Sequence, residues 1–303
     1  MKYKYSEILL GMIESQQWTS SSLAKSINVS PTSISQYVHK KYNAGLKNLE
    51  VKIEQFLNMQ QERSVDPNYD LKIPFQMTTN AERVLKLAKF CHTYHKFGLL
   101  TGNTGYGKSY PLHKYADENA NVIYIAAKRR MTSKNLLERI HKALGLQTKQ
   151  VRDWMFLFDE IVNFLKGKNF LIIVDECDWL SWGSLNDLRQ IRDEVESVGL
   201  IIAGTETLYH TIKGNDQVFA QLYDRIDSYL KLSPNTATEI QMMAKSVLTD
   251  LYTDKIGQLF VLNSMGKGRR VHKILGEAYR IADVNKQKVN EDTVITATQL
   301  LVS

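Results

Sequence analysis

Apolar residues follow two different periods along this chain, and the change between them divides it into parts. Residues 1–62 carry apolar positions at helical spacing, beginning with Ile8, Leu9, Met12 and Ile13 on one face. From residue 79 short apolar runs alternate with helical stretches, and residues 233–303 return to helical spacing alone. The runs that we expect to be strands are FGLLTG (97–102), VIYIAA (122–127), FLIIVDE (170–176), GLIIAGT (199–205) and SYLKL (228–232). Such strands predict a parallel sheet with helices on both faces, a three-layer α/β core.

Prolines mark the boundaries between these parts. Pro67 and Pro74 lie in a stretch without a sustained period, which predicts a linker over residues 63–78. Pro234 follows the last apolar run and begins the helical C-terminal stretch. We therefore expect an all-α domain at 1–62, an α/β core at 79–232 and a helical domain at 233–303.

Within the first part, residues 20–40 have the pattern of a helix-turn-helix. Leu23, Ala24 and Ile27 predict one inward helix face, Asn28-Val29-Ser30 a tight turn, and Ile34 and Val38 the inward anchors of a second helix. Ser30 is a suitable N-cap and Pro31 suits the first helical position. The second helix would direct outward Thr32, Ser33, Ser35, Gln36, His39 and Lys40. Side chains of this kind suit DNA phosphates and base edges, although a small helical bundle used for protein contacts remains the alternative.

Composition narrows the class of protein. The chain has 303 residues, of which 43% are hydrophobic and 23% charged, which excludes a disordered or fibrous chain. No apolar run approaches the roughly 18 residues that span a bilayer, and the N-terminus lacks the pattern of a signal peptide. Cys91 and Cys177 are too few for a disulfide framework or a cysteine-rich zinc site. We expect a cytoplasmic protein of a bacterial cell, or of a phage or mobile element within one, with no membrane partner.

The positive charge is concentrated in one segment. The net charge is +7, and residues 125–152 hold eight Lys and Arg residues against Glu138 alone, so this segment by itself equals the net charge of the whole chain. A solvated helix face and a surface that binds a phosphate backbone are both consistent with such a run. Its basic residues are Lys128, Arg129, Arg130, Lys134, Arg139, Lys142, Lys149 and Arg152.

The most specific motif directly follows the first predicted strand. Gly102-Asn103-Thr104-Gly105-Tyr106-Gly107-Lys108-Ser109 fits G-x-x-x-x-G-K-[ST] and leads through Tyr110 into a helix. Glycines let backbone N–H groups surround a phosphate, and the helix N-terminus adds its dipole. Lys108 would contact the β- and γ-phosphates of ATP, and Ser109 would ligate Mg²⁺.

Three further strand ends carry candidate chemistry. Asp175 and Glu176 end the third strand, where Asp175 would hold Mg²⁺ and Glu176 would polarise the attacking water. Thr205 ends the fourth strand and could orient that water, the alternative being ordinary strand-end polarity. Arg225 precedes the fifth strand and could reach a neighbouring subunit's γ-phosphate, the alternative being a surface ion pair with Asp224 or Asp227.

A basic sequence in the C-terminal helical part completes the set. Gly266-Lys267-Gly268-Arg269-Arg270 could bring an arginine onto the nucleotide. Arg269 is the first candidate for that contact and Arg270 the second, with a DNA-facing role for the stretch as the rival.

These elements, in this order, resemble the AAA+ ATPases, and the whole chain resembles the target-DNA-capture branch that includes the MuB and IstB-like transposition helpers. The resemblance is strongest in GNTGYGKS, in LIIVDECDWL, and from LRQIRDEVESVGLIIAG through LYHTIKGNDQVFAQLYDRI. It implies an AAA+ core with a C-terminal helical lid, ATP and Mg²⁺ as cofactors, and ATP-dependent helical filaments on double-stranded DNA that recruit a transposase. The transposase in turn stimulates hydrolysis and disassembly.

The resemblance also implies residue roles. Lys108, Ser109, Asp175 and Glu176 carry over directly, and Arg225 carries over as a finger acting on the neighbouring subunit. Thr205 departs from the Asn common at its position, which leaves its sensor role open. The loop Lys128-Arg129-Arg130 is expected to touch DNA, in agreement with the charge distribution.

Three other functions fit parts of the pattern. A helicase-loader ATPase would share the nucleotide motifs and act on a different partner. An ATP-gated transcription regulator would read one operator through residues 20–45. A nucleotide-binding scaffold without turnover is disfavoured by Glu176 and Arg225.

Overall fold

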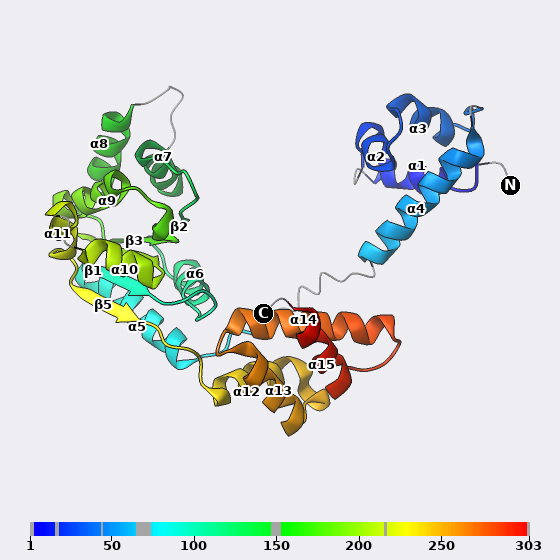
Figure 1. Ribbon diagram of the computed structural model, residues 1–303. Helices are drawn as coiled ribbons and strands as arrows, with labels where there is room; N and C mark the ends of the chain where they lie inside the picture. The colour runs from blue at the N-terminus through cyan, green and yellow to red at the C-terminus, as the bar shows by residue number, and fades with distance from the viewer. Residues whose placement is uncertain are drawn as a thin grey trace. The chain divides into compact units, whose positions relative to one another are not determined.

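The computed structural model describes residues 3–15, 18–43, 45–64, 74–146, 153–214 and 217–301 (Figure 1). The chain divides into two compact units, Met1–Asp70 and Leu71–Ser303. Most of the predicted linker, Pro67 included, lies outside the described residues, as do Lys149 and Arg152 of the basic segment. The predicted boundaries at 62, 78 and 232 stay predictions.

The first unit is helical throughout its described part. Its helices are α1 (Ser6–Glu14), α2 (Ser20–Ile27), α3 (Pro31–Val38) and α4 (Leu46–Ser64). The Ser30 hydroxyl accepts the backbone N–H of Ser33 at 3.1 Å, and Pro31 occupies the first position of α3, as predicted. Asn28 closes α2 with φ +57°, a left-handed conformation that Asn tolerates better than most residues. The two predicted helices and the turn between them are therefore present, and their identity as a helix-turn-helix motif stays a prediction.

The core of this unit explains how its helices hold together. The predicted inward residues of α2 and α3 are all buried, and Tyr37 and Ile53 join them with no exposed surface. Burial raises the pKa of Tyr37 to about 12. The Tyr37 hydroxyl donates to Glu50 at 3.1 Å and accepts the backbone N–H of Tyr5 at 3.2 Å.

The prediction for α1 was wrong in one respect. Leu9 is buried, but Ile8 is 52% exposed, because the following helices cover a narrower face of α1 than the apolar spacing predicts.

The second unit is built on a parallel sheet. Its strands are β1 (Phe97–Thr101), β2 (Val122–Ala126), β3 (Phe170–Asp175), β4 (Val198–Gly204) and β5 (Ser228–Lys231). Within the described residues they form one five-stranded sheet in the order β2-β3-β4-β1-β5, with every neighbouring pair parallel. All the predicted strands are confirmed. Because the sheet is parallel, the segments that follow β1, β3 and β4 meet at one edge.

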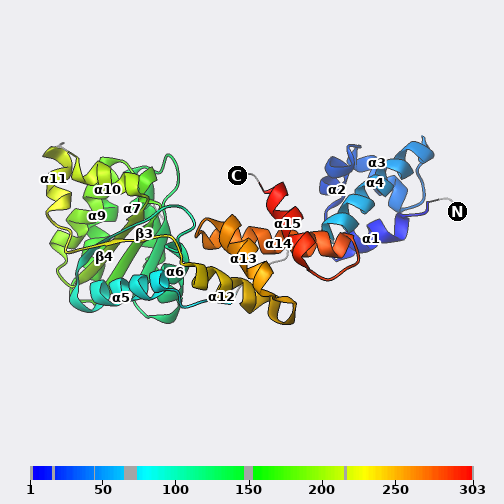
Figure 2. The same cartoon turned by 60° about the horizontal axis from the view of Figure 1, so that its bottom comes forward.

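Helices cover both faces of this sheet, as the prediction of a three-layer core requires (Figure 2). On one face lie α5 (Thr79–Tyr94) and α6 (Ser109–Glu118), whose buried residues pack with Leu100, Ile173 and Ile201. The other face packs against α7 (Ser133–Ala143), α8 (Trp154–Leu165), α9 (Trp182–Glu194), α10 (Glu206–Lys213) and α11 (Gln217–Tyr223). Cys91 and Cys177 are buried on opposite faces as free thiols, and burial raises the pKa of Cys91 to about 12.

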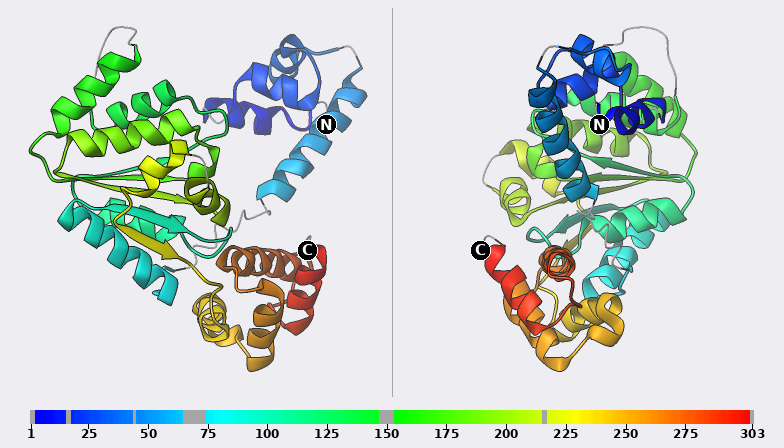
Figure 3. Two further views of the ribbon diagram at one scale, coloured as in Figure 1. Left: turned by 60° about the vertical axis from the view of Figure 1, so that its left-hand side comes forward. Right: turned by 90° about the vertical axis from the view of Figure 1, so that its right-hand side faces the viewer.

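The rest of the second unit is a helical lid (Figure 3). It consists of α12 (Ala237–Leu248), the short 3₁₀ helix η2 (Thr249–Leu251), α13 (Asp254–Ser264), α14 (Gly268–Val284) and α15 (Glu291–Leu300). These helices share their own core around Phe260, Ile274 and Val294. Across the described ranges, none of the helices has the length and hydropathy needed to traverse a bilayer.

Candidate functional site

The loop between β1 and α6 is the one that the sequence predicts to bind phosphate. Gly105 and Gly107 both adopt φ +91°, which side-chain-bearing residues rarely reach. The Lys108 ammonium lies back on this loop, donating to the carbonyl oxygen of Gly102 and, at 3.3 Å, to that of Asn103. The loop from Gly102 to Ser109 then runs directly into the N-terminus of α6, where backbone N–H groups favour anions. The predicted nucleotide residues therefore lie together as one loop.

Lys108 faces several carboxylates. Burial lowers its pKa, while the negative charges of Asp175, Asp178 and Glu176 act in the opposite direction. These acidic residues lie at or just after the end of β3. The structure therefore brings the P-loop lysine and the Asp175–Glu176 pair to the same edge of the sheet, as predicted.

Asp175 is held by a partner that the sequence did not reveal. Its side chain is buried, with 1% of the residue exposed, and it accepts a hydrogen bond from the Tyr124 hydroxyl at 2.8 Å. Burial, followed by the charge of Asp175 and its hydrogen bond, raises the pKa of Tyr124, while the Ser109 side chain acts in the opposite direction. Tyr124 on β2 therefore holds Asp175, one of the two residues predicted to ligate the metal.

This oxygen cluster fits Mg²⁺. Hydroxyl and carboxylate oxygens are the ligands that Mg²⁺ prefers, and it commonly takes one or two of them together with substrate phosphates and water. Among the residues that the structure describes, no group of three or more His, Cys, Asp or Glu side chains could hold a metal by itself. Ser109 and Asp175 would therefore hold the ion only together with nucleotide oxygens.

Glu176 has an unusual backbone conformation. It adopts φ +58° and ψ 35°, in the left-handed region that disfavours residues with a Cβ. Its N–H donates to Asp175 Oδ1 at 2.7 Å, and its carbonyl accepts the N–H of Trp179 at 3.1 Å. This turn begins the 3₁₀ helix η1 (Cys177–Trp179) and determines where the Glu176 side chain points.

Thr205 follows β4, between β3 and β1 in the sheet order, which is the position expected for a residue that orients water. Its hydroxyl donates to Asp178 Oδ1 at 2.6 Å and accepts the N–H of Thr207 at 3.2 Å. Its own N–H donates to Asp178 Oδ2 at 2.7 Å. The side chain is therefore occupied by Asp178 and by the cap of α10, and its sensor role stays a prediction.

The lid contacts the P-loop directly. The N–H of Gly268 donates to the carbonyl of Gly105 at 2.9 Å. Arg269, at the start of α14, contributes a positive charge that lowers the pKa of Lys108, after the larger effect of burial. Arg270 is half-buried, with a buried Nε that has no partner among the described residues. Of the two candidates, Arg269 is the one whose charge affects the pKa of Lys108.

Two polar residues fasten the lid and the P-loop to the start of α5. Asn80 is buried, and its side-chain amide donates to the carbonyls of Tyr106 at 3.1 Å and Ser233 at 2.7 Å. Glu239 on α12 accepts the N–H of Thr79 at 2.6 Å and that of Thr236 at 2.7 Å. Burial raises the pKa of Glu239, but these hydrogen bonds from Thr236 and Thr79 outweigh it, and the net pKa lies below 4.5.

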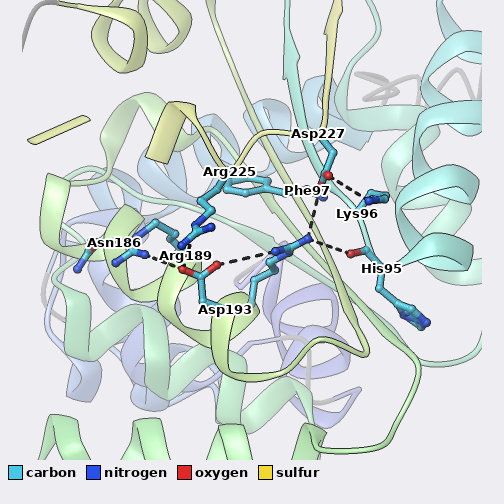
Figure 4. Close-up of polar contacts among 9 residues, drawn as sticks. His95, Lys96, Phe97, Asn186, Arg189, Asp193, Arg225 and Asp227 are labelled. Carbon is cyan, nitrogen blue, oxygen red and sulfur yellow. Dashed lines mark hydrogen bonds and ion pairs between the residues drawn. The ribbon is translucent and has the colours of Figure 1, made fainter. Parts of the chain in front are cut away.

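Arg225 lies in an ion-pair network that is separate from the loop containing Lys108 (Figure 4). Its Nε is 3.4 Å from Asp193 Oδ2, and 54% of its side chain is exposed. Asp193 also receives Arg189 at 2.6 Å, while Asp227 is paired with Lys96 and Arg192. Arg225 does form an ion pair, but its partner is Asp193 on α9 rather than Asp224 or Asp227, and its role as a finger stays a prediction.

This network is at the edge of the sheet opposite the P-loop. Asp227 accepts the N–H of Phe97, at the beginning of β1, at 2.7 Å, whereas the P-loop follows the end of β1. A strand of this length spans about 15 Å. Arg225 therefore does not belong to the nucleotide site of its own chain.

The basic loop after β2 lies at the edge of the sheet where β1 and β3 also end, which is the edge that carries Lys108. Lys128, Arg129 and Arg130 are all exposed in a turn closed by the N–H of Met131 and the carbonyl of Lys128 at 2.9 Å. The Arg129 guanidinium lies 6.0 Å from the centre of the Trp179 ring, which is 49% exposed. Lys134 is half-buried on α7 and lies 3.9 Å from Glu138. The loop is thus open to a polyanion, and Lys134 less so.

The candidate DNA-contacting residues of the first unit differ in availability. Thr32 and Gln36 are exposed on α3. Ser33 is half-buried, with its backbone N–H and hydroxyl both bonded to the Ser30 hydroxyl. Lys40 is exposed and lies 3.5 Å from Glu7. A DNA-binding role for these residues stays a prediction.

Comparisons with known proteins add to this geometry. Residues 91–212 match the family described as the AAA domain. The chain is 23% identical over 264 residues to the Mu-like prophage FluMu DNA transposition protein B of Haemophilus influenzae, covering 86% of this chain and 90% of that protein. It is also 23% identical over 296 residues to the ATP-dependent target DNA activator B of Escherichia phage Mu, covering 90% and 93%.

A solved structure agrees on the fold. The ORC1 protein of Aeropyrum pernix, in complex with DNA, superposes with a TM-score of 0.60 at 20% identity. The match covers 78% of this chain and 68% of that one. Together with the five-stranded parallel sheet, this similarity identifies an α/β AAA+ fold.

Proposed function

We propose that this chain, a MuB-like AAA+ protein, is an ATPase that binds double-stranded DNA in an ATP-dependent manner with little sequence preference and delivers it as a target to a transposase. The homologues named for DNA transposition and for target DNA activation support the transposition role, and the AAA domain supports the ATPase activity. The sequence preference, the filament and the transposase contact are our extension of those names to this chain.

ATP binds in the loop from Gly102 to Tyr110. The backbone N–H groups of this loop and of the first turn of α6 surround the phosphates, and Lys108 leaves its carbonyl partners to reach the β- and γ-phosphates. Mg²⁺, when bound, would neutralise charge that develops on the phosphate oxygens. Ser109 and Asp175 would hold it, with Tyr124 fixing the orientation of Asp175.

Hydrolysis needs a base for the attacking water. Glu176 supplies it, because its carboxylate follows the strand next to β4 and shares the edge of the sheet with Lys108. The Glu176 carboxylate accepts the proton of the water as the water attacks the γ-phosphorus, and the bond from that phosphorus to the β–γ bridging oxygen breaks to release ADP and phosphate. Arg269 in the lid contacts the same phosphates and couples the position of the lid to the nucleotide.

The ATPase site is completed by a second copy of the chain. The single observation that carries this proposal is the location of Arg225 at the edge of the sheet opposite Lys108. A head-to-tail arrangement brings Arg225 to the ATP molecule of the next subunit, and a contact of that kind repeats into a ring or a helical filament. ATP therefore favours the assembled form, and loss of the γ-phosphate loosens it.

DNA binding follows from assembly. Each subunit contributes Lys128, Arg129 and Arg130, with Lys134 behind them, so many weak phosphate contacts add along one duplex. Thr32, Ser33, Gln36 and Lys40 on the first unit offer a second, smaller set of contacts. The transposase would bind the assembled form and stimulate hydrolysis.

Electron microscopy of the protein with linear non-specific DNA tests this function. Continuous filaments with ATP and none with ADP are expected. Isolated rings, or bare DNA under both conditions, would favour a helicase loader, and binding at one discrete site would favour a transcription regulator.

A further inference from the structure

Asp178 makes a two-point contact with the end of β4. It lies in η1, two residues after Glu176, and each of its carboxylate oxygens accepts one hydrogen bond from Thr205. The backbone N–H contact is 2.7 Å and the hydroxyl contact 2.6 Å. Charge-assisted hydrogen bonds of this length are among the stronger ones in proteins.

The chain leaves room for this contact at Gly204. A Cβ at Gly204 would lie 2.7 Å from Asp178 Oδ2 and 2.7 Å from Leu208 Cδ2, closer than such atoms approach. Gly204 is in the buried strand β4 and has no positive φ. Its lack of a side chain therefore serves the approach of Asp178 rather than a special backbone conformation.

The contact closes a short turn that begins at Glu176. One end of the turn is fixed to Asp175, through the N–H of Glu176, and the middle is closed by the bond from Trp179 to the Glu176 carbonyl. Asp178 fixes the turn to β4, the strand that lies between β3 and β1. These contacts together hold Glu176 in its left-handed conformation, which isolated residues disfavour.

We propose that Asp178 is a positioning residue for Glu176, and that Thr205 acts in the reaction through Asp178. The proposal rests on the proposed ATPase function. Breaking the contact lets the turn relax, so the Glu176 carboxylate no longer faces the attacking water in the correct orientation. The P-loop, which binds ATP from β1 and α6, keeps its own hydrogen bonds.

Thr205→Val and Thr205→Ser separate this role from a general structural one. Valine has the shape of threonine without the hydroxyl, whereas serine keeps the hydroxyl. Single-turnover hydrolysis of bound ATP, in the presence of DNA, is measured together with the dissociation constant for a fluorescent ATP analogue and the melting temperature. Thr211→Val, the same change at an exposed position on α10, is the matched control.

The proposal predicts a slower chemical step with unchanged binding. Asp178→Ala and Thr205→Val should lower the single-turnover rate about tenfold or more, because small misplacements of reacting groups have large effects. The dissociation constant should stay within about twofold, Thr205→Ser should restore most of the rate, and the double variant should be no slower than Asp178→Ala.

Other results overturn the proposal. Unchanged rates in Thr205→Val, equal losses in Thr205→Val and Thr205→Ser, or a loss fully explained by weaker ATP binding would each do so. If Asp178→Ala does not fold, Thr205→Val decides alone, since it alters one hydroxyl. A wild-type protein that does not hydrolyse ATP would instead defeat the ATPase function itself.

Discussion

Lys108 and Arg225 lie at opposite edges of the same sheet. Lys108 follows the carboxyl end of β1, whereas Arg225 precedes β5, which pairs with β1 in parallel from Gly98–Ser228 to Thr101–Lys231. The strand length between them, about 15 Å, is too large for both to hold one phosphate. The two groups can meet only across a contact between two copies of the chain.

Replacement of the P-loop lysine tests nucleotide binding. Lys108→Ala should weaken ATP binding at least about tenfold, because a half-buried cation beside the phosphates is lost. It should also abolish the ATP-dependent part of DNA binding. Titration with a fluorescent ATP analogue measures the first effect, with Lys89→Ala on the exposed face of α5 as control. Equal ATP affinity in Lys108→Ala and the control would contradict the assignment.

Replacement of the base should separate binding from turnover. Glu176→Gln should bind ATP with normal affinity and hydrolyse it about 10²–10⁴-fold more slowly, as expected when a general base is removed. Its assemblies on DNA should outlast those of the wild type after free ATP is removed. Light scattering and phosphate release measure the two properties, and Glu194→Gln on α9 provides an exposed control. Assemblies that decay at the wild-type rate would refute the role of Glu176.

The basic loop is expected to dominate DNA affinity. Replacing Lys128, Arg129 and Arg130 by Ala should weaken duplex binding uniformly across sequences. The slope of log affinity against log salt should fall by about 0.9 for each DNA phosphate that the variant no longer neutralises. Fluorescence anisotropy at several salt concentrations measures both the affinity and its salt dependence.

A matched control removes the same charge from exposed positions of the lid, in the triple variant Lys255→Ala, Lys273→Ala, Lys286→Ala, and it should have a smaller effect. Equal effects in both variants would mean that net charge, not the loop, binds DNA.

Glu239 should make the stability of the lid junction depend on pH. Its pKa in the folded protein lies below 4.5, so its carboxylate stabilises the fold fully above pH 4.5 and progressively less as the pH falls through the lower, folded value. Glu239→Gln should cost about 1 kcal/mol at pH 7. Thermal melts of wild type and variant should therefore converge in acid. A melting-temperature difference that stays constant down to pH 3, or one matched by the exposed Glu118→Gln, would be inconsistent with this role.

The sequence was sufficient for the strands because each is local, and the nucleotide motifs are local predictions of the same kind. Each predicted strand is a continuous apolar run, and the P-loop is defined by consecutive residues whose glycines permit one backbone path. The exposed Ile8 shows the limit of periodicity, since spacing along α1 does not say how wide a face the neighbouring helices cover.

The partners of the site residues could not be predicted, because they come from other elements. Tyr124 is 51 residues from Asp175 and Asp193 is 32 residues from Arg225, and in neither case does spacing indicate contact. Asp178 was closer to detection, as the third carboxylate of VDECD, but its two bonds to Thr205 depend on the order of strands in the sheet.

The shared ATPase site is tested most directly by mixing two inactive proteins. Glu176→Gln keeps Arg225 and lacks the base, whereas Arg225→Ala keeps the base and lacks the finger. In a head-to-tail assembly about a quarter of randomly formed interfaces contain both intact groups, so DNA-stimulated ATP hydrolysis should return to about a quarter of the wild-type rate. The control mixture of Glu176→Gln with the double variant Glu176→Gln, Arg225→Ala should stay inactive. Hydrolysis in the first mixture no greater than in the separate proteins would contradict the account.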